Sequence, residues 1–392
     1  MNMNIFSLFT NIFIFVICGG MFVIIPQLTR KSYLFGVRIP PEEAGCEEAV
    51  KLKKAYVTKC IFVITVLLAA CVVQFIVAPE YTLHATLYSP LLIAPLFFII
   101  YIPNWKKAVM LKAERGWAVS NVLFAETKSG SARGNLSNLP WVWYAISLVI
   151  VVLSVALAVY RMPHLPDLIP VHFNAAGEVT RYTEPTWFYV MIVPLANASL
   201  VLVMLVSNII IERAKLQIDS NKPTLSFAQH RIYRRRMGHA LGLMTLGFVI
   251  VITPLIIPMV YPDAEWTTAL MRTAAPIVFV FSLVMCLPPV LAYVFSGQGG
   301  CKIKIDLPDE GASLGEVSAS SAPKIAGRGD DKYWIWGMFY CNPDDPALFI
   351  EDRFGSNISL NYSRLSAKIF VGVTAVVLVG TYVWATVMLL AA

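Results

Sequence analysis

The sequence predicts an all-α polytopic membrane protein with eight transmembrane helices and a small cytoplasmic β-rich module before the last helix. Of its 392 residues, 57% are hydrophobic and only 14% are charged, whereas charged residues make up about 25% of an ordinary soluble domain. The apolar residues also fall into blocks of about 20, the length that a helix needs to cross roughly 30 Å of hydrocarbon. None of the blocks contains Asp or Glu; they span 5–27, 60–79, 85–103, 140–160, 187–211, 239–260, 273–295 and 369–390.

The basic residues predict how these helices are oriented. Of the 31 Lys and Arg residues, 28 lie in the segments 28–59, 104–139, 212–238 and 296–368. Because Lys and Arg are retained in cytoplasmic loops, these four segments are expected inside the cell and both termini outside. The same loops account for the net charge of +7, so the lipid bilayer is the expected partner and no nucleic acid is needed.

Residues 1–139 are predicted to form an N-terminal region of three membrane helices. Arg30 and Lys31 follow the first apolar block instead of preceding it, which favours an anchor over a cleavable signal peptide. The first cytoplasmic loop contains the extended stretch FGVRIP (35–40), followed by a run that changes from acidic to basic at 43–54. We interpret this run as an amphipathic helix on the membrane surface.

Residues 140–211 are predicted to form a helix-loop-helix unit with an extracytoplasmic loop at 162–186. This loop carries LPDLIPVHFNAAGEVTRY (165–182) between two membrane-length segments. Its prolines favour extended backbone, and 174–177 reads as a turn that ends at a glycine. The loop is therefore expected to be ordered and to fold back over the outer mouth of the helix bundle. Its polar groups available to a ligand are Asp167, His172, Asn174, Glu178 and Arg181.

Three interpretations of this loop remain open from its residues alone. His172 and Asn174 could provide hydrogen bonds to a peptide or toxin, or could cap the loop by bonding its own backbone. A metal site would use His164, His172, Asp167 or Glu178, but their spacing matches no zinc signature such as HExxH. We therefore predict no metal site and no cofactor.

The remaining chain is divided into four parts. Residues 212–308 hold the sixth and seventh helices and a basic loop, and Gly238, Gly242 and Gly247 would allow close helix packing. Residues 309–331 are rich in small and polar residues and are predicted to be a flexible linker. Residues 332–366 form an aromatic module, and 367–392 the last transmembrane helix.

The aromatic module is predicted to be β-rich and to pack on another loop. The runs 338–341 and 358–362 are typical of strands, and two turn signals interrupt the module. A segment of this size cannot bury a core by itself. The first cytoplasmic loop, with its FGVRIP stretch, is the expected packing partner.

The extracytoplasmic loop resembles the hallmark of an uncharacterised bacterial membrane domain, LP-x-x-IP-x-H-[FW]-[ND]-x-x-G. The matching residues are Leu165, Pro166, Ile169, Pro170, His172, Phe173, Asn174 and Gly177. The same domain occurs in the SdpI-like proteins, which give immunity to the sporulation-delaying toxin. The resemblance implies a protein of the bacterial plasma membrane that responds to a toxic peptide. We predict His172, Asn174, Asp167, Gly177 and Arg181 as the ligand-binding residues of the loop, and Pro166, Pro170 and Phe173 as structural residues of the motif.

The aromatic module resembles a second uncharacterised family that often accompanies this loop. The matching residues are Tyr333, Trp334, Gly337, Tyr340, Asn342, Pro343, Asp345, Pro346, Arg353, Gly355, Leu360 and Asn361. SdpI-like proteins generally have other C-terminal helices and lack such a module. Toxin immunity is the function expected by extrapolation within this broad superfamily, a sister role such as sensing envelope stress stays equally open, and a cytoplasmic regulator is a further expected partner.

Enzymatic chemistry is not predicted. The sequence has no P-loop, G-x-G-x-x-G, GxSxG or HExxH pattern, each of which would carry a specific chemistry. The apolar blocks contain no Asp, which excludes an intramembrane aspartyl protease. The alternative function is a transporter or exporter of a small molecule or peptide, although coupled transporters usually place acidic groups near the midplane.

Overall fold

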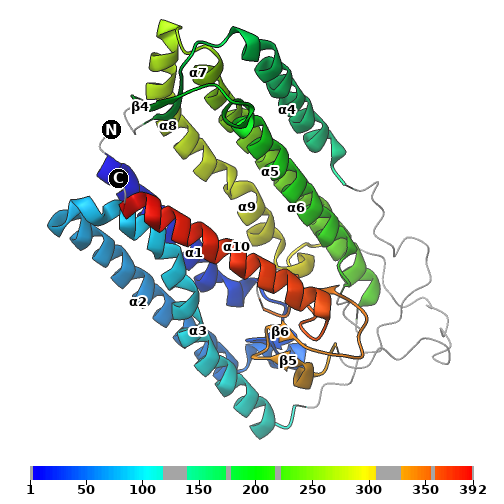
Figure 1. The fold of residues 1–392 in the computed structure, drawn as a ribbon. Coiled ribbons are helices and arrows are strands. Elements are labelled where there is room, and N and C mark those ends of the chain that lie inside the picture. The colour runs from blue at the N-terminus through cyan, green and yellow to red at the C-terminus, as the bar shows by residue number, and fades with distance from the viewer. Residues whose placement is uncertain are drawn as a thin grey trace. The chain divides into compact units, whose positions relative to one another are not determined.

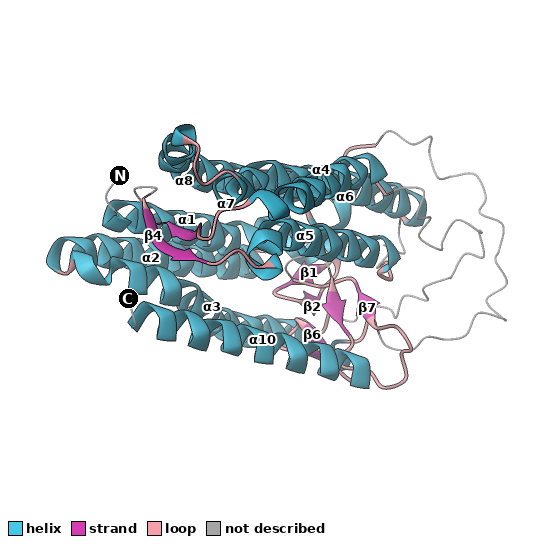
Figure 2. Ribbon diagram, turned by 45° about the horizontal axis from the view of Figure 1, so that its top comes forward, coloured by secondary structure: helices cyan, strands magenta, loops and turns pink. Residues whose placement is uncertain are grey.

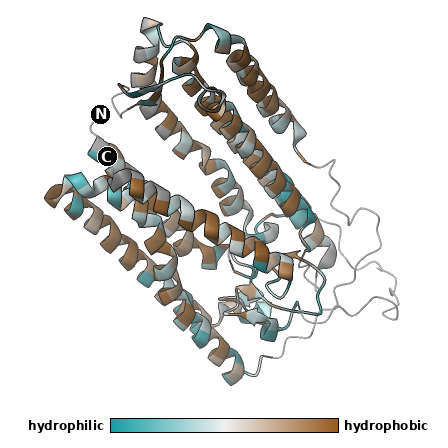
Figure 3. Cartoon of the chain, viewed as in Figure 1, coloured by the Kyte–Doolittle hydropathy of each residue, from teal (hydrophilic) through white to brown (hydrophobic). Residues whose placement is uncertain are grey.

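The computed structural model describes residues 3–117, 139–173, 178–216, 222–305, 328–354 and 358–390 (Figure 1). Among these residues, eight helices are long and apolar enough to cross a membrane, and the strands form only two-stranded sheets. The predicted fold class is thus confirmed, and the protein is an integral membrane protein. Hydrophobic residues run along the long helices, as the hydropathy colours of Figure 3 show.

The chain divides into two compact units, each described here by itself. The hairpin unit comprises 129–213 and 231–296, and the module unit comprises 2–128, 214–230 and 297–392. Most of the predicted linker, from 309 to 327, lies outside the described residues.

The hairpin unit is built from helices and one β-hairpin. Its elements are α4 (Trp141–Arg161), β3 (Ile169–Phe173), β4 (Val179–Thr183), α5 (Trp187–Arg213), most of α6 (Pro223–Ile252), α7 (Ile257–Val260), α8 (Glu265–Met285) and α9 (Leu287–Ser296). The predicted seventh membrane segment, 273–295, is interrupted at Cys286, where α8 ends and α9 follows, although Val280–Gly300 is still long and apolar enough to cross a membrane. Pro288 and Pro289 explain the break, since proline cannot donate the next helical hydrogen bonds and its ring crowds the preceding turn.

Close packing in the hairpin unit depends on the glycines of α6. A Cβ atom on Gly242 would lie 2.6 Å from Trp143 Cδ1 of α4, and one on Gly238 would lie 3.2 Å from Asn208 Oδ1 of α5. Asn208 Nδ2 donates to the Gly238 carbonyl at 3.2 Å and to the Tyr144 hydroxyl at 3.1 Å. The predicted role of these glycines in close packing is confirmed.

Among the described residues, the module unit contains the other helices and three short strand pairings. Its elements are α1 (Met3–Leu28), β1 (Tyr33–Leu34), β2 (Val37–Arg38), α2 (Glu47–Val77), α3 (Thr82–Glu114), β5 (Trp334–Ile335), β6 (Phe339–Tyr340), β7 (Phe349–Ile350), β8 (Ser359–Leu360) and α10 (Leu365–Leu390). The helices α1, α2 and α3 contact one another, and Phe22 stacks on Phe97 with ring centroids 4.2 Å apart. The separate surface helix expected at 43–54 is wrong, because α2 runs unbroken from Glu47. No Gly or Pro interrupts 47–77, so nothing stops the helix from continuing through the charged turns.

The core of the module unit joins the first loop to the aromatic module. Leu34, Phe35 and Ile39 are buried together with Tyr101 of α3 and Phe354. In the module, β5 pairs with β6 and β7 pairs with β8, and a bridge between Tyr340 and Asn361 links the two pairs. Figure 2 shows these strands beside β1 and β2. The predicted β-rich module and its packing on the FGVRIP loop are both confirmed.

Candidate functional site

The predicted extracytoplasmic loop at 162–186 contains an antiparallel β-hairpin. Strands β3 and β4 pair with the register Ile169–Thr183, Pro170–Tyr182, His172–Arg181 and Phe173–Val179, with irregularities on both sides of His172. The hairpin lies at the end of its unit where α7 and the start of α8 are found (Figure 1). The expectation of an ordered, extended loop is confirmed for these strands. The predicted turn, with site residues Asn174 and Gly177, lies outside the described residues.

The base of the hairpin is fixed to the helices by apolar burial. Ile169 is fully buried in a cluster that includes Ala158 of α4, Val190 of α5 and Ile256, and Pro170 is also buried. Pro166 and Phe173 are partly buried. Because a buried side chain of this size stabilises its position by about 1.5–3 kcal/mol, the strand cannot leave the surface of the unit at low cost.

The polar residues of the hairpin face solvent. His172, Arg181 and Asp167 are exposed, and His172 Nδ1 lies 2.6 Å from Thr180 Oγ1. The Thr180 hydroxyl donates to the His172 carbonyl oxygen at 3.3 Å, so its oxygen accepts from Nδ1–H, and Nε2 of the neutral imidazole is an acceptor. The structure thus brings His172 and Arg181 together as cross-strand neighbours, while Asp167 precedes the strand. Within the described residues, no group of three His, Cys, Asp or Glu side chains is placed to hold a metal ion.

The interior of the aromatic module is a second polar site. The Arg328 guanidinium donates to both carboxylate oxygens of Asp345, at 2.5 and 2.8 Å, and the Tyr340 hydroxyl donates to the same carboxylate at 3.1 Å. Burial opposes the charge on Asp345, but the hydrogen bonds from Arg328 hold the pKa of this carboxyl below its ordinary value. Trp334 closes the site by donating its indole N–H to the Arg328 carbonyl at 2.9 Å.

Two asparagines join the ends of the module. Asn361 Nδ2 donates to the carbonyl oxygens of Asn342 and Asp345, at 2.8 and 3.0 Å, and the Asn342 backbone N–H donates back to Asn361 Oδ1 at 3.1 Å. Both side chains are fully buried. Pro343 is exposed in the turn, and Gly355 lies outside the described residues.

Gly337 and Gly36 are where the module meets the first loop. A Cβ atom on Gly36 would lie 2.1 Å from the Gly337 carbonyl oxygen, and both glycines have positive φ. Arg353 is fully buried beside them and donates to the Gly36 carbonyl at 3.2 Å and to Asp331 at 2.5 Å. Close backbone contact therefore explains why glycine is needed in both segments.

A buried ionic cluster in the module unit was not predicted from the sequence. Arg30, which follows α1, forms an ion pair with Glu351, and His230 Nε2 lies 2.5 Å from Arg30 Nη2 and 2.9 Å from Glu351 Oε1. His230 Nδ1 lies 2.6 Å from the Ser226 carbonyl oxygen. The cluster ties the ends of two membrane helices to the module. One feature of the sequence could have indicated part of this cluster. Proline is favoured in the first turn of a helix, so Pro223 is consistent with a helix that begins there and includes His230.

The comparisons with known proteins recognise only the hairpin region. A family model described as Domain of unknown function (DUF1648) matches residues 149–197, which cover part of α4, the hairpin and the first turns of α5. No curated protein and no solved structure matches the chain. The match supports the resemblance seen in the loop, at the level of a domain found in membrane proteins.

Proposed function

We propose that this chain is a non-enzymatic immunity protein of the bacterial plasma membrane, whose extracytoplasmic hairpin binds a toxic peptide and so protects the cell. The observation that carries the proposal is the contrast within β3. Ile169 is fully buried in the helical core, while His172 on the same strand is exposed. A rigidly held strand that presents polar groups to solvent is suited to binding.

A peptide fits the backbone of the hairpin. Within the described residues, β3 and β4 pair only with each other, so each strand has an outer edge. An extended peptide can add to such an edge through main-chain hydrogen bonds, while side chains supply specificity. His172 and Arg181 would then contact polar or acidic groups of the peptide, and the exposed Tyr182 would contact its apolar groups.

The aromatic module would stabilise the protein or relay peptide binding to a cytoplasmic regulator. Its support is the cluster of Arg30, His230 and Glu351, which joins the module to α1 and to the start of α6. A change in the position of either helix would alter a buried ion pair, and breaking such a pair costs about 3–5 kcal/mol.

Survival of a toxin-sensitive bacterial strain tests the proposal. The strain would express the wild type, His172→Ala or the matched control His164→Ala during challenge with a sporulation-delaying-type peptide. His164 is an exposed histidine of the same loop, outside the paired strands. We expect protection by the wild type and the control, and loss of protection in His172→Ala at equal membrane abundance. Absence of protection by the wild type would overturn immunity to this toxin class, and a poorly inserted His172→Ala would assign the histidine a structural role.

A further inference from the structure

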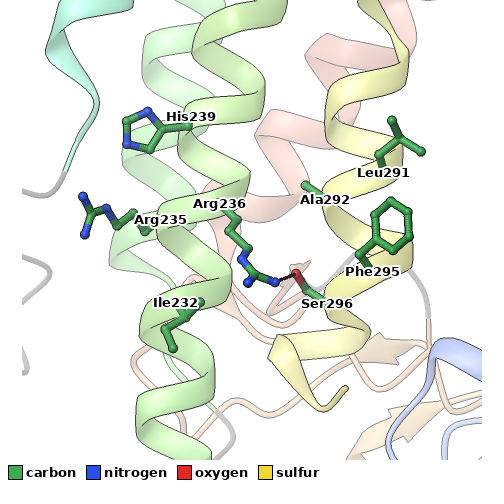
Figure 4. A pocket seen from close by; sticks show the side chains of 8 residues that line it. All are labelled: Ile232, Arg235, Arg236, His239, Leu291, Ala292, Phe295 and Ser296. Carbon is green, nitrogen blue, oxygen red and sulfur yellow. Dashed lines mark hydrogen bonds between the residues drawn. The ribbon is translucent and has the colours of Figure 1, made fainter. Parts of the chain in front are cut away.

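The hairpin unit has a pocket between α6 and α9, far along the sequence from the hairpin. Its volume is about 690 Å³, and it is open on one side. The residues that line it are Ile232, Arg235, Arg236, His239, Leu291, Ala292, Phe295 and Ser296. Four come from α6 and four from α9 (Figure 4), and none is acidic.

Hydrogen-bond donors form the polar wall of this pocket. Arg236 extends from α6 towards α9, where its Nη1 lies 3.4 Å from the buried Ser296 Oγ (Figure 4). Arg235 and His239 also line the pocket, but their side chains project from α6 away from α9 in this view (Figure 4). His239 Nδ1 accepts the indole N–H of Trp143 at 3.1 Å. Since indole is only a donor, the neutral imidazole carries its proton on Nε2 and can donate it to a ligand.

On α9, Leu291 and Phe295 form an exposed apolar part of the lining. Phe295 and Leu291 lie one helical turn apart, and their exposed fractions are 71% and 46%. Guanidinium groups favour phosphate, to which they donate in a fixed planar geometry. An exposed phenylalanine one residue from the end of the helix favours a hydrocarbon chain. One ligand that satisfies both walls is an amphiphile with an anionic head.

The predicted position of the pocket in the membrane, at the level of the lipid headgroups, also suits an anionic amphiphile. The predicted bilayer segment of α6 begins at 239, directly after Arg235 and Arg236, and the predicted seventh segment ends at 295, next to Ser296. The charge pattern places these ends at the cytoplasmic surface, where anionic lipids gather.

We propose that this pocket binds an anionic phospholipid, with its phosphate on Arg236 and its acyl chain along Leu291 and Phe295. Free phosphate shares the headgroup chemistry but would leave the apolar wall uncovered. The proposal is independent of the peptide function, because it uses no residue of the hairpin.

Lipid retention by the purified full-length protein tests this site. Protein in a neutral detergent would be mixed with dioleoylphosphatidylglycerol or dioleoylphosphatidylcholine, and bound lipid counted by native mass spectrometry. The variants are Arg236→Gln, Phe295→Ala and the matched control Arg231→Gln, which removes an exposed arginine of α6 outside the pocket. We expect phosphatidylglycerol binding to weaken about fivefold in Arg236→Gln, the effect of one arginine near a lipid surface. Binding should also weaken in Phe295→Ala and remain unchanged in Arg231→Gln.

Three results would overturn the proposal. Equal retention of phosphatidylcholine would show that no anion is recognised. An equal loss in Arg231→Gln would show that binding follows net charge instead of the pocket. Full displacement of phosphatidylglycerol by millimolar inorganic phosphate, with Phe295→Ala unaffected, would identify free phosphate as the ligand.

Discussion

At the scale of single residues, the adjacent acids Glu351 and Asp352 have different environments. Glu351 is buried against Arg30 and His230. The Asp352 carboxylate accepts the Phe354 backbone N–H at 3.1 Å. Burial, together with the charge of Glu351, raises the pKa of Asp352 to about 7.

Asp352 should make the protein less stable as the pH rises. Its carboxyl has a higher pKa in the folded state than its ordinary 3.8, so the folded state binds the proton more tightly. The resulting stabilisation is complete below about pH 4 and is lost as the pH rises towards 7. We expect Asp352→Asn to reduce the fall in Tm between pH 5 and pH 8, measured by tryptophan emission in detergent. Asp344→Asn, an exposed acid of the same module, is the control, and equal pH dependence in all three proteins would contradict the prediction.

The residues of the module were easier to predict than the ionic cluster. Asn342, Asp345 and Asn361 were singled out by the resemblance to a second family, whose matching residues lie within one short segment. Arg30, His230 and Glu351 are separated by 121 to 321 positions, and no local pattern reports such a contact.

At the scale of elements, the turn between β1 and β2 packs closely against the turn between β5 and β6. Gly36 and Gly337 make this contact. Gly36→Ala should destabilise this contact by about 1–3 kcal/mol, because its φ of +74° is strained for alanine and its Cβ would meet backbone at 2.1 Å. Thermal unfolding followed by tryptophan emission measures the effect. Gly45→Ala, where a Cβ meets nothing within 4 Å, is the matched control. An unchanged Tm in Gly36→Ala would show that the two segments do not pack as described.

Hydropathy predicted the membrane helices well and their ends poorly. It reports the part of a helix that lies in lipid, whereas α2 and α6 begin 13 and 16 residues before their predicted apolar blocks at 60 and 239. The charged turns that precede these blocks are helical because no Gly or Pro interrupts 47–59 or 224–237. The reverse error occurred at Pro288 and Pro289, where an unbroken apolar block hides a break in the helix.

At the scale of the whole molecule, the orientation of the termini is still a prediction from the distribution of Lys and Arg. Alkaline phosphatase, which is active only outside the cytoplasm, should be active when fused after Leu390 and inactive when fused after Ile305. The eight helices require this result if the basic loops are cytoplasmic. The opposite pattern would place the hairpin inside the cell and would exclude an extracellular peptide as its ligand.

The packing of Gly36 against Gly337 also bears on how the protein is made. About 300 residues separate the two glycines, and synthesis at about 5–20 residues per second takes roughly 15–60 s to cover that distance. Throughout this interval Leu34, Phe35 and Ile39, which the finished protein buries, lack the module that completes their core. The nascent chain therefore exposes an apolar loop until translation is nearly complete. If the ribosome stalls before the module, the incomplete chain keeps this loop exposed and becomes a substrate for chaperones and proteases.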